Sequence, residues 1–210
     1  GKVLLRIRLA CDEVAWVTEP QPLFLFVARL AYLPQSYSSI HEHFKSFLPP
    51  PMGVAYQVWL DYNGIPLRWH YPAGVLCDVL VGAEVPMPLD LTVHFRECPT
   101  KELLPFGGIG DLKHAVITAF RQSVFLQHGS ANPFMRLPVK QQQRLWDAIA
   151  AVDTDGTWAV QKQLLCPTLS KCKSLAARIH ISSATQQHAS LLHPMPPFRT
   201  EGEGSGGGGG

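Results

Sequence analysis

From Trp59 to Gly74 the chain reads Trp-Leu-Asp-Tyr-Asn-Gly-Ile-Pro-Leu-Arg-Trp-His-Tyr-Pro-Ala-Gly, and this stretch decides the fold. Strand-forming residues precede Asn63 and Gly64, a pair that favours the positive φ angles of a tight hairpin turn. The residues from Ile65 to Tyr71 then predict the returning strand. Apolar residues at helical spacing come next, so the pattern predicts strand, turn, strand and helix in succession. The helical positions are Val75, Leu76, Val79 and Leu80.

The flanking residues extend this unit in both directions. Residues 23–32 are apolar at both alternating sets of positions, which is typical of a strand buried on two faces. Ser39 followed by Glu42 forms a capping-box pattern and predicts the start of a helix. Residues 89–96 alternate between apolar and polar side chains and predict a strand with one wet face. We therefore expect an α+β domain over residues 21–105, with the ubiquitin-like β-grasp as the leading candidate.

Two further segments surround this domain. Residues 1–20 carry leucines that fall loosely on one side, which predicts an N-terminal helix or arm. Residues 106–170 predict a helix-rich domain. Its first helix has an apolar stripe and ends at Gly129, the next begins at Pro138, and Asp155 can cap a third.

The last part of the chain returns to strand patterns. Residues 171–204 predict the start of a second β-grasp domain, with strands at Ser174 to Ser182 and at Ser190 to Pro197. Residues 205–210 are one serine and five glycines, which predicts a flexible tail or linker. We expect the second domain to be truncated after about one hairpin.

Composition narrows the classes of function. The 210 residues are 46% hydrophobic and carry a net charge of +2, with arginines scattered among apolar residues. Scattered arginines argue against nucleic acid as the main partner, although a weak contact with an anionic membrane surface stays open. The longest apolar run, Leu23 to Leu33, is too short to span a membrane, and no secretory signal is visible. Five irregularly spaced cysteines are typical of free thiols, so we expect a cytoplasmic protein.

The sequence predicts neither a metal ion nor another cofactor. His41 and His43 stand two residues apart on a predicted helix, so their rings diverge instead of sharing a ligand. Cys166 and Cys172 lack the short spacing of zinc ligands.

A catalytic reading has only weak support. Cys77 with His70, or Cys98 with another histidine, would serve a small cytoplasmic cysteine hydrolase, but Cys77 stands among apolar residues that favour a protonated core thiol. Aromatic residues and arginines dominate interface hot spots, so protein binding is the leading class and a generic ubiquitin-like binding module is a further alternative. The aromatic candidates are Trp59, Trp69, Tyr71, Phe106, Phe134, Trp146 and Trp158.

Residues 22–33, 59–74 and 91–95 resemble autophagy-related protein five in sequence and in order. Leu145, Trp146 and residues 158–165 keep that family's spacing. The resemblance implies two ubiquitin-like domains flanking a helical domain, in a non-enzymatic subunit of an E3-like complex. It also implies a ubiquitin-like modifier, autophagy-related protein twelve, and a coiled-coil partner, autophagy-related protein sixteen. Such an assembly promotes lipidation of autophagy-related protein eight at the isolation membrane during autophagosome formation.

The same resemblance implies the residues of a partner site. Arg29, Gly74 and Asp78 match positions at which the family contacts its coiled-coil partner. Arg29 and Asp78 would supply charge-assisted contacts, and Gly74 would allow close approach.

One departure changes the expected mechanism. Counted from Leu103 and Leu104, the family's acceptor lysine falls at Arg121, and a guanidinium is effectively never deprotonated to attack a thioester. Nine residues at about 100° each place Arg121 opposite Leu112, so we expect the position to face outward.

We therefore expect reversible binding of the modifier, with Arg121, Trp69 and His70 as its binding residues. In the alternative, Arg121 is merely solvated and Lys113 or Lys140 accepts the modifier.

Overall fold

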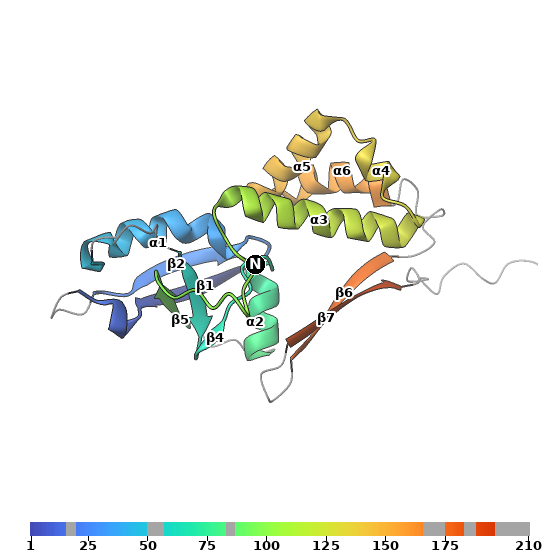
Figure 1. Ribbon diagram of the computed structural model, residues 1–210. Coiled ribbons are helices and arrows are strands. Elements are labelled where there is room, and N and C mark those ends of the chain that lie inside the picture. The colour runs from blue at the N-terminus through green and yellow to red at the C-terminus, as the bar shows by residue number, and fades with distance from the viewer. Residues whose placement is uncertain (16–19, 50–56, 83–86, 166–174, 183–187, 196–210) are drawn as a thin grey trace, which may run out of the picture.

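The computed structural model describes residues 1–15, 20–49, 57–82, 87–165, 175–182 and 188–195 (Figure 1). Its first domain is a five-stranded sheet in the order β2-β1-β5-β3-β4. β1 runs parallel to β5 at the centre, and the other neighbouring strands are antiparallel. This arrangement is a β-grasp, so the predicted α+β class and ubiquitin-like domain are confirmed. The strands are β1 (Lys2–Leu9), β2 (Leu23–Ala28), β3 (Trp59–Tyr62), β4 (Ile65–Pro66) and β5 (Leu89–His94).

Helices pack against this sheet and enclose its core. Apolar side chains from β1, β3 and β5 meet those of α1 and α2 in one cluster that includes Val3, Leu60, Val93, Phe44 and Leu76. The helical elements are α1 (Tyr37–Phe44) and α2 (Ala73–Val81), with short turns η1 (Cys11–Glu13), η2 (Leu33–Ser36) and η3 (Lys45–Phe47).

The predicted hairpin is present. Asn63 and Gly64 have φ angles of 52° and 80°, the left-handed values that a two-residue hairpin turn needs. The returning strand is shorter than expected, because β4 ends at Pro66 and the chain then bends so that the Tyr71 amide donates to the Arg68 carbonyl.

The N-terminal segment is a strand and not the predicted helix or arm. Val3, Leu5, Ile7 and Leu9 are all buried and alternate with polar or half-buried positions, so β1 presents one face to the core. Pairing with both β2 and β5 makes it a central strand of the sheet.

Two smaller expectations also need correction. β2 is an edge strand, and Phe24 and Phe26 on its open face are 53% and 72% exposed, so it is not buried on two faces. Ser39 lies inside α1, which begins at Tyr37 directly after η2, so the pattern of Ser39 with Glu42 does not mark the start of this helix.

The middle of the chain is a helical bundle, as predicted. Its long first helix ends at Gly129, which has a left-handed φ of 67°, and Pro138 precedes the third helix. Asp153, and not Asp155, caps the last helix, because its Oδ1 accepts from the Gly156 amide at 2.9 Å. None of the described helices is long and apolar enough to cross a membrane. The helices are α3 (Ile109–His128), α4 (Asn132–Met135), α5 (Val139–Ala150) and α6 (Thr154–Leu165).

Trp69 joins the first domain to the bundle. Its ring is only 3% exposed and packs with Leu112 and Val116 of α3 and Trp146 of α5. Its indole nitrogen donates to the Leu104 carbonyl at 2.8 Å. The two units therefore share one buried cluster.

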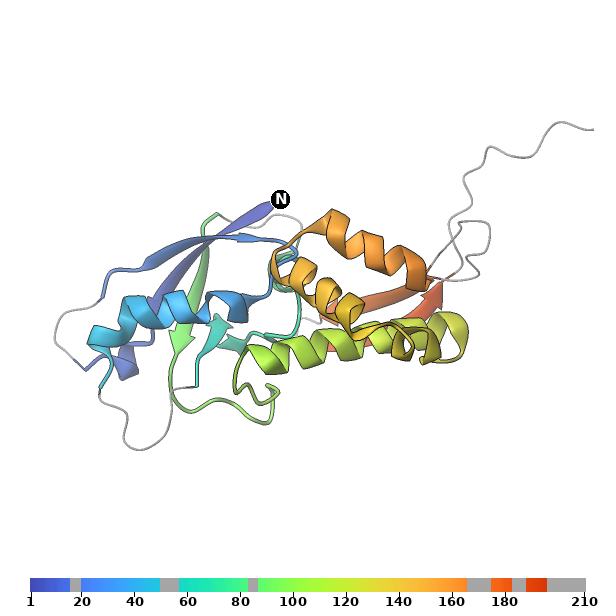
Figure 2. The ribbon, with the colours of Figure 1, turned by 90° about the horizontal axis from the view of Figure 1, so that it is seen from above.

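A two-stranded hairpin follows the bundle. β6 (Leu175–Ser182) pairs with β7 (His188–Met195), and the hairpin lies beneath α3 and beside α2 (Figures 1 and 2). Arg178 ties it to α3 by donating to Gln122 Oε1 at 3.1 Å. The hairpin agrees with the start of a second β region, whereas Cys166, Cys172 and the Gly-rich tail lie outside the described residues.

Candidate partner-binding sites

The three residues expected to contact a coiled-coil partner lie together where β2 ends and α2 begins. The Arg29 guanidinium donates to both carboxylate oxygens of Asp78 at 2.6 Å and to the Gly74 carbonyl at 3.4 Å. The ion pair is accessible, since the two side chains are 36% and 57% exposed. It therefore presents both a positive and a negative group at the surface.

Gly74 is required by the chain itself. Its amide donates to the Arg29 carbonyl at 2.7 Å, and a Cβ at this position would lie 2.9 Å from that oxygen and 2.8 Å from the Arg29 Cβ. This close contact is internal, between the start of α2 and the residue that follows β2, and the expected approach of a partner at Gly74 stays a prediction.

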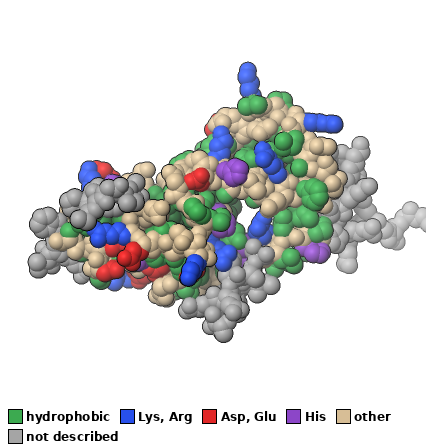
Figure 3. Space-filling view, viewed as in Figure 1, with side chains coloured by type: hydrophobic (Ala, Val, Ile, Leu, Met, Phe, Trp, Pro, Cys, Tyr) green, Lys and Arg blue, Asp and Glu red, His purple; other side chains and the backbone are tan. Residues whose placement is uncertain are grey.

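A cavity of about 480 Å³, lined by Leu30 next in sequence to Arg29, lies where the first domain, the bundle and the hairpin meet. Figure 3 shows the molecule hollowed between these three parts. Leu30 and Trp158 are 57% and 54% exposed at its rim. Its walls are mostly apolar, and representative residues are Leu30, Tyr32, Phe120, Trp158 and Leu192. A site with this lining suits an apolar side-chain row of a protein partner.

The residues around this cavity were not all predictable. Leu30 directly follows Arg29 in the sequence. Only the sheet order shows that β2 is an edge strand and that Leu30, just beyond its end, is exposed. Arg178 comes from the hairpin, and no local pattern in the sequence places it at the same cavity as Leu30.

Arg121 does not face outward as expected. It lies on the side of α3 that also carries Ile117 and Val124, which pack in the bundle core. The side chain is half-buried, and its guanidinium carbon lies 5.6 Å above the centre of the buried Phe134 ring. The reason is that α3 buries two stripes, one toward the first domain and one toward α5 and α6.

Trp69 and His70 are not brought together with Arg121. Trp69 is buried against Leu112, so it offers no contact surface to a partner and its predicted binding role needs correction. Arg121 comes nine residues after Leu112 in α3, which is about 14 Å along the helix axis at 1.5 Å per residue. It lies on the opposite side of the helix from Leu112. The His70 ring packs against the rings of its two aromatic neighbours. Its centroid lies 5.6 Å from that of Trp69 and 4.3 Å from that of Tyr71.

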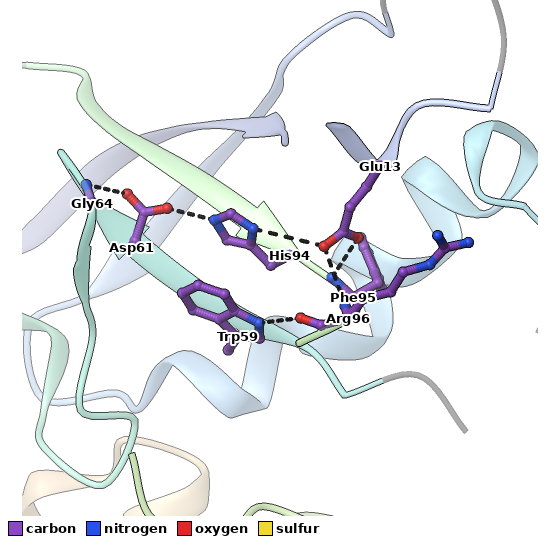
Figure 4. A network of polar contacts seen from close by, with 7 residues as sticks. All are labelled: Glu13, Trp59, Asp61, Gly64, His94, Phe95 and Arg96. Atoms are coloured by element: carbon purple, nitrogen blue, oxygen red, sulfur yellow. Dashed lines mark hydrogen bonds and ion pairs between the residues drawn. The ribbon is translucent and has the colours of Figure 1, made fainter. Parts of the chain in front are cut away.

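A polar network that sequence reasoning missed lies on the sheet (Figure 4). His94 Nε2 lies 2.6 Å from Asp61 Oδ2, and His94 Nδ1 lies 3.7 Å from Glu13 Oε1. Glu13 and Asp61 are only 6% and 5% exposed, and Glu13 also accepts the Phe95 amide at 2.8 Å. The Trp59 ring stacks on the imidazole with 3.9 Å between centroids.

The charges of this network shift the titration of its histidine. Burial by itself lowers the pKa of His94, but the polar contacts and charges of Glu13 and Asp61 outweigh burial and raise that pKa above its usual value. The alternation of residues 89–96 indicated a wet position for His94, and only the register of β5 against β3 places it beside Asp61.

Neither Cys77 nor Cys98, the two candidate nucleophiles, has the lowered thiol pKa of an activated cysteine. Burial raises the pKa of the Cys77 thiol, although the charge of Arg29 opposes this shift, and burial also raises the pKa of Cys98. Both thiols are therefore protonated at neutral pH, which argues against the hydrolase alternative. Within the described part of the chain, no three His, Cys, Asp or Glu side chains gather in a way that could hold a metal ion.

The fold and sites define a class of protein: a ubiquitin-like domain fused to a helical bundle, with an apolar interdomain cavity. Residues 1–95 match the family description "Autophagy protein ATG5, UblA domain", and residues 110–167 match "Autophagy protein ATG5, alpha-helical bundle region". The chain belongs to the Autophagy protein 5 family, which confirms the resemblance.

Individual relatives agree with this assignment. Autophagy protein 5 of Oryza sativa subsp. indica is 32% identical over 164 residues, which cover 78% of this chain and 42% of the relative. Autophagy protein 5 of Arabidopsis thaliana is 31% identical over 80% of this chain and 49% of its own length. The chain thus spans about half the length of these relatives. The crystal structure of Kluyveromyces marxianus Atg5 has the same fold, with a TM-score of 0.80, 22% identity, and coverage of 93% of this chain and 75% of that one.

Proposed function

We propose that this protein is a non-enzymatic scaffold of autophagy that binds a ubiquitin-like modifier reversibly and a coiled-coil partner at a separate site. By the resemblance described above, the modifier is autophagy-related protein twelve and the coiled-coil partner is autophagy-related protein sixteen. The assembled complex acts in the manner of an E3, promoting lipidation of autophagy-related protein eight. It works in the cytoplasm and is recruited to the isolation membrane.

The observation that carries this proposal is Arg121 at the position of the family's acceptor lysine. A guanidinium is effectively always protonated in proteins and cannot attack a thioester. The Arg121 guanidinium carbon also lies 5.6 Å over the centre of the Phe134 ring, so a cation–π contact restrains this side chain.

A denaturing gel tests reversible binding. The protein is produced together with the modifier and its conjugation enzymes, and complex formation is checked by co-purification before denaturation. We expect co-purification and, after boiling with reductant, two separate bands. A conjugate band that survives this treatment would refute reversible binding, and its loss in the double variant Lys113→Arg/Lys140→Arg would then assign the acceptor.

The coiled-coil site can be tested through the ion pair of Arg29 with Asp78. Reversing one charge also breaks the internal pair, so a charge swap, Arg29→Asp/Asp78→Arg, is the sharper variant because it keeps attraction within the chain. We expect pull-down of the coiled-coil partner to fail with the swap while the melting temperature stays near that of the wild type. Cys11→Ser, at an exposed thiol, serves as control and should bind normally. Normal binding by the swap variant would contradict a direct role of these charges.

A further inference from the structure

The outer edge of β2 lacks the features that usually protect the edge of a sheet. Natural edge strands carry charged side chains, prolines or bulges, or are covered by another element. The six residues of β2 are Leu-Phe-Leu-Phe-Val-Ala, with neither a charge nor a proline. Within the described part of the chain, only β1 pairs with this strand. The other side of β2 is therefore open to a further strand.

The register of β1 with β2 shows which backbone groups are already used. The Arg29 amide donates to the Gly1 carbonyl at 3.1 Å, and these residues lie opposite each other when the register is continued by one residue. Hydrogen-bonded and non-hydrogen-bonded pairs alternate along an antiparallel ladder. Leu25 and Val27 therefore direct their backbone groups toward β1.

The alternate residues of β2 direct their backbone groups toward the open edge. These residues are Phe24, Phe26 and Ala28, by the same alternation. The Ala28 carbonyl accepts the Ala31 amide at 2.9 Å, so it is already paired. The amides of all three residues and the carbonyls of the two phenylalanines remain for an added strand.

The side chains next to these groups form an apolar surface. Phe24 and Phe26 are exposed on the outer face of the sheet, and Leu4 of β1 lies directly opposite Phe26. A strand added beside β2 would place its own residues opposite the two phenylalanines, where apolar cross-strand pairs are stabilising. Two apolar residues of a partner, separated by one position, would cover this surface.

The charges around the edge favour an acidic partner. β1 and β2 carry three basic residues and no acidic one. Arg6 forms an ion pair with Asp90, whereas the exposed Lys2 and Arg8 form none with a described residue. An added strand would lie about 10 Å from β1, two strand spacings away, and a basic and an acidic side chain together span that distance. Lys2 and Arg8 stand at the two ends of β1, so acidic residues are expected on both sides of the apolar pair.

Two other occupants fit the edge less well. A second copy of this chain would bring the same cations toward one another, and like charges across a sheet are destabilising. A lipid surface could cover the phenylalanines, but it cannot form a ladder with the outward amides and carbonyls. An extended peptide satisfies both the backbone groups and the side chains.

We propose that β2 binds an extended peptide segment of a protein partner as an additional strand, with two alternate apolar residues flanked by acidic ones. In this mode of recognition the backbone hydrogen bonds supply affinity and the alternate side chains supply specificity. The added strand is antiparallel to β2, since antiparallel pairing is slightly more stable per residue. This inference goes beyond the proposed function, because it involves neither Arg121 nor the ion pair of Arg29 with Asp78.

Proton–nitrogen NMR of the backbone amides in the full chain tests this inference. The probe is the heptapeptide Glu-Thr-Val-Thr-Val-Thr-Glu, acetylated at its N-terminus and amidated at its C-terminus. We expect the amide protons of Phe24, Phe26 and Ala28 to shift downfield and saturate as they gain acceptors. The amides of Leu25 and Val27, which face β1, should shift much less.

N-methylated peptides test the backbone ladder directly. In the antiparallel arrangement the amides of the two valines face β2, so methylating both should weaken binding by about tenfold or more. Methylating the last two threonines, whose amides face away, is the matched control and should leave binding nearly unchanged. The reverse result would support the same edge with a parallel strand, because the amides that face β2 are then those of the threonines. Equal effects of the two sets would contradict the proposed ladder.

Protein variants test the side-chain contacts. Phe26→Thr keeps a strand-forming residue at an exposed position and should weaken peptide binding by about five- to tenfold through lost apolar contact. Phe125→Gln, at an exposed phenylalanine of α3, is the control and should bind the peptide normally. The double variant Lys2→Gln/Arg8→Gln should weaken binding by up to about fivefold, and the peptide with glutamines at both ends should show a similar loss.

The remaining outcomes would overturn the inference. Absence of any shift with the peptide would do so directly. Slow exchange of the Phe24, Phe26 and Ala28 amides in the free protein would show that the edge is already covered, by a second copy if the protection rises with protein concentration and by the chain itself if it does not. Binding to vesicles of phosphatidylcholine and phosphatidylserine that is lost in Phe26→Thr, without a response to the peptide, would assign the surface to a membrane instead.

Discussion

Replacing His94 by Gln should weaken the fold in a pH-dependent manner. The imidazole lies between Asp61 and Glu13, and these carboxylates raise its folded-state pKa against the opposing effect of burial. Since the folded pKa lies above the unfolded one, the imidazolium contributes its full stabilisation below the unfolded value of about 6.5. This contribution is lost as the pH rises through the raised folded pKa.

The structure also indicates the size of the effect. Removing one partner of a buried charged group costs about 3–5 kcal/mol. The lower end of this range applies here, because the His94 side chain is 18% exposed and the distance from its Nδ1 to Glu13 Oε1 is long, at 3.7 Å. For a chain of this length, each kcal/mol changes the melting temperature by about 2–4 °C, so a loss of about 3 kcal/mol lowers it by about 6–12 °C.

Urea unfolding at pH 5.5 and pH 8.5 measures this loss, followed by tryptophan fluorescence because Trp59 stacks on His94. The difference in unfolding free energy between wild type and His94→Gln should be larger at pH 5.5. His114→Gln, at an exposed histidine of α3, is the matched control and should show the same pH dependence as the wild type. A difference for His94→Gln that is equal at both pH values, or larger at pH 8.5, would refute the reasoning.

Three further substitutions follow from the geometry. Gly74→Ala should lower the unfolding free energy by about 1–3 kcal/mol, because the new Cβ would lie 2.9 Å from a backbone carbonyl oxygen. Gly110→Ala is the control, since a Cβ there would have no atom within 4 Å and should not lower the unfolding free energy. Equal melting temperatures of the two variants would contradict this expectation. Arg121→Lys should restore a nucleophilic amine and give a boiling-resistant conjugate with the modifier and its enzymes, so a gel without that band would count against the assigned acceptor position. Asp153→Ala should cost about 1 kcal/mol through the lost cap of α6, and urea unfolding should show a smaller loss for Asp155→Ala.

Sequence reasoning predicted the elements whose signals are local. The turn at Asn63 and Gly64 and the helix end at Gly129 each depend on backbone conformations that few residues adopt, and both occur where expected. The N-terminal strand was missed although Val3, Leu5 and Ile7 alternate strictly, because eight residues also fit a loose helical stripe through the leucines.

The predictions that failed concern residues whose surroundings are set by parts of the chain that are distant in sequence. A single apolar stripe through Leu112 predicted an exposed Arg121, but α3 lies between two units and buries a second stripe through Val124. The pairing of His94 with Asp61 likewise depends on the register of two strands that are separated by α2. Arg29, Gly74 and Asp78 were named through a family resemblance, and their proximity becomes evident only in the folded chain.

The indole of Trp69 has a consequence for how this protein can be divided. It belongs by sequence to the first domain but is covered by residues of α3 and α5. Cutting the chain between these parts would expose a large aromatic surface and leave the indole N–H without the Leu104 carbonyl if that residue were removed with the helices. The cooperative folding unit is therefore larger than the ubiquitin-like domain. If the domain were transferred alone to another protein, the surface around Trp69 would have to be redesigned.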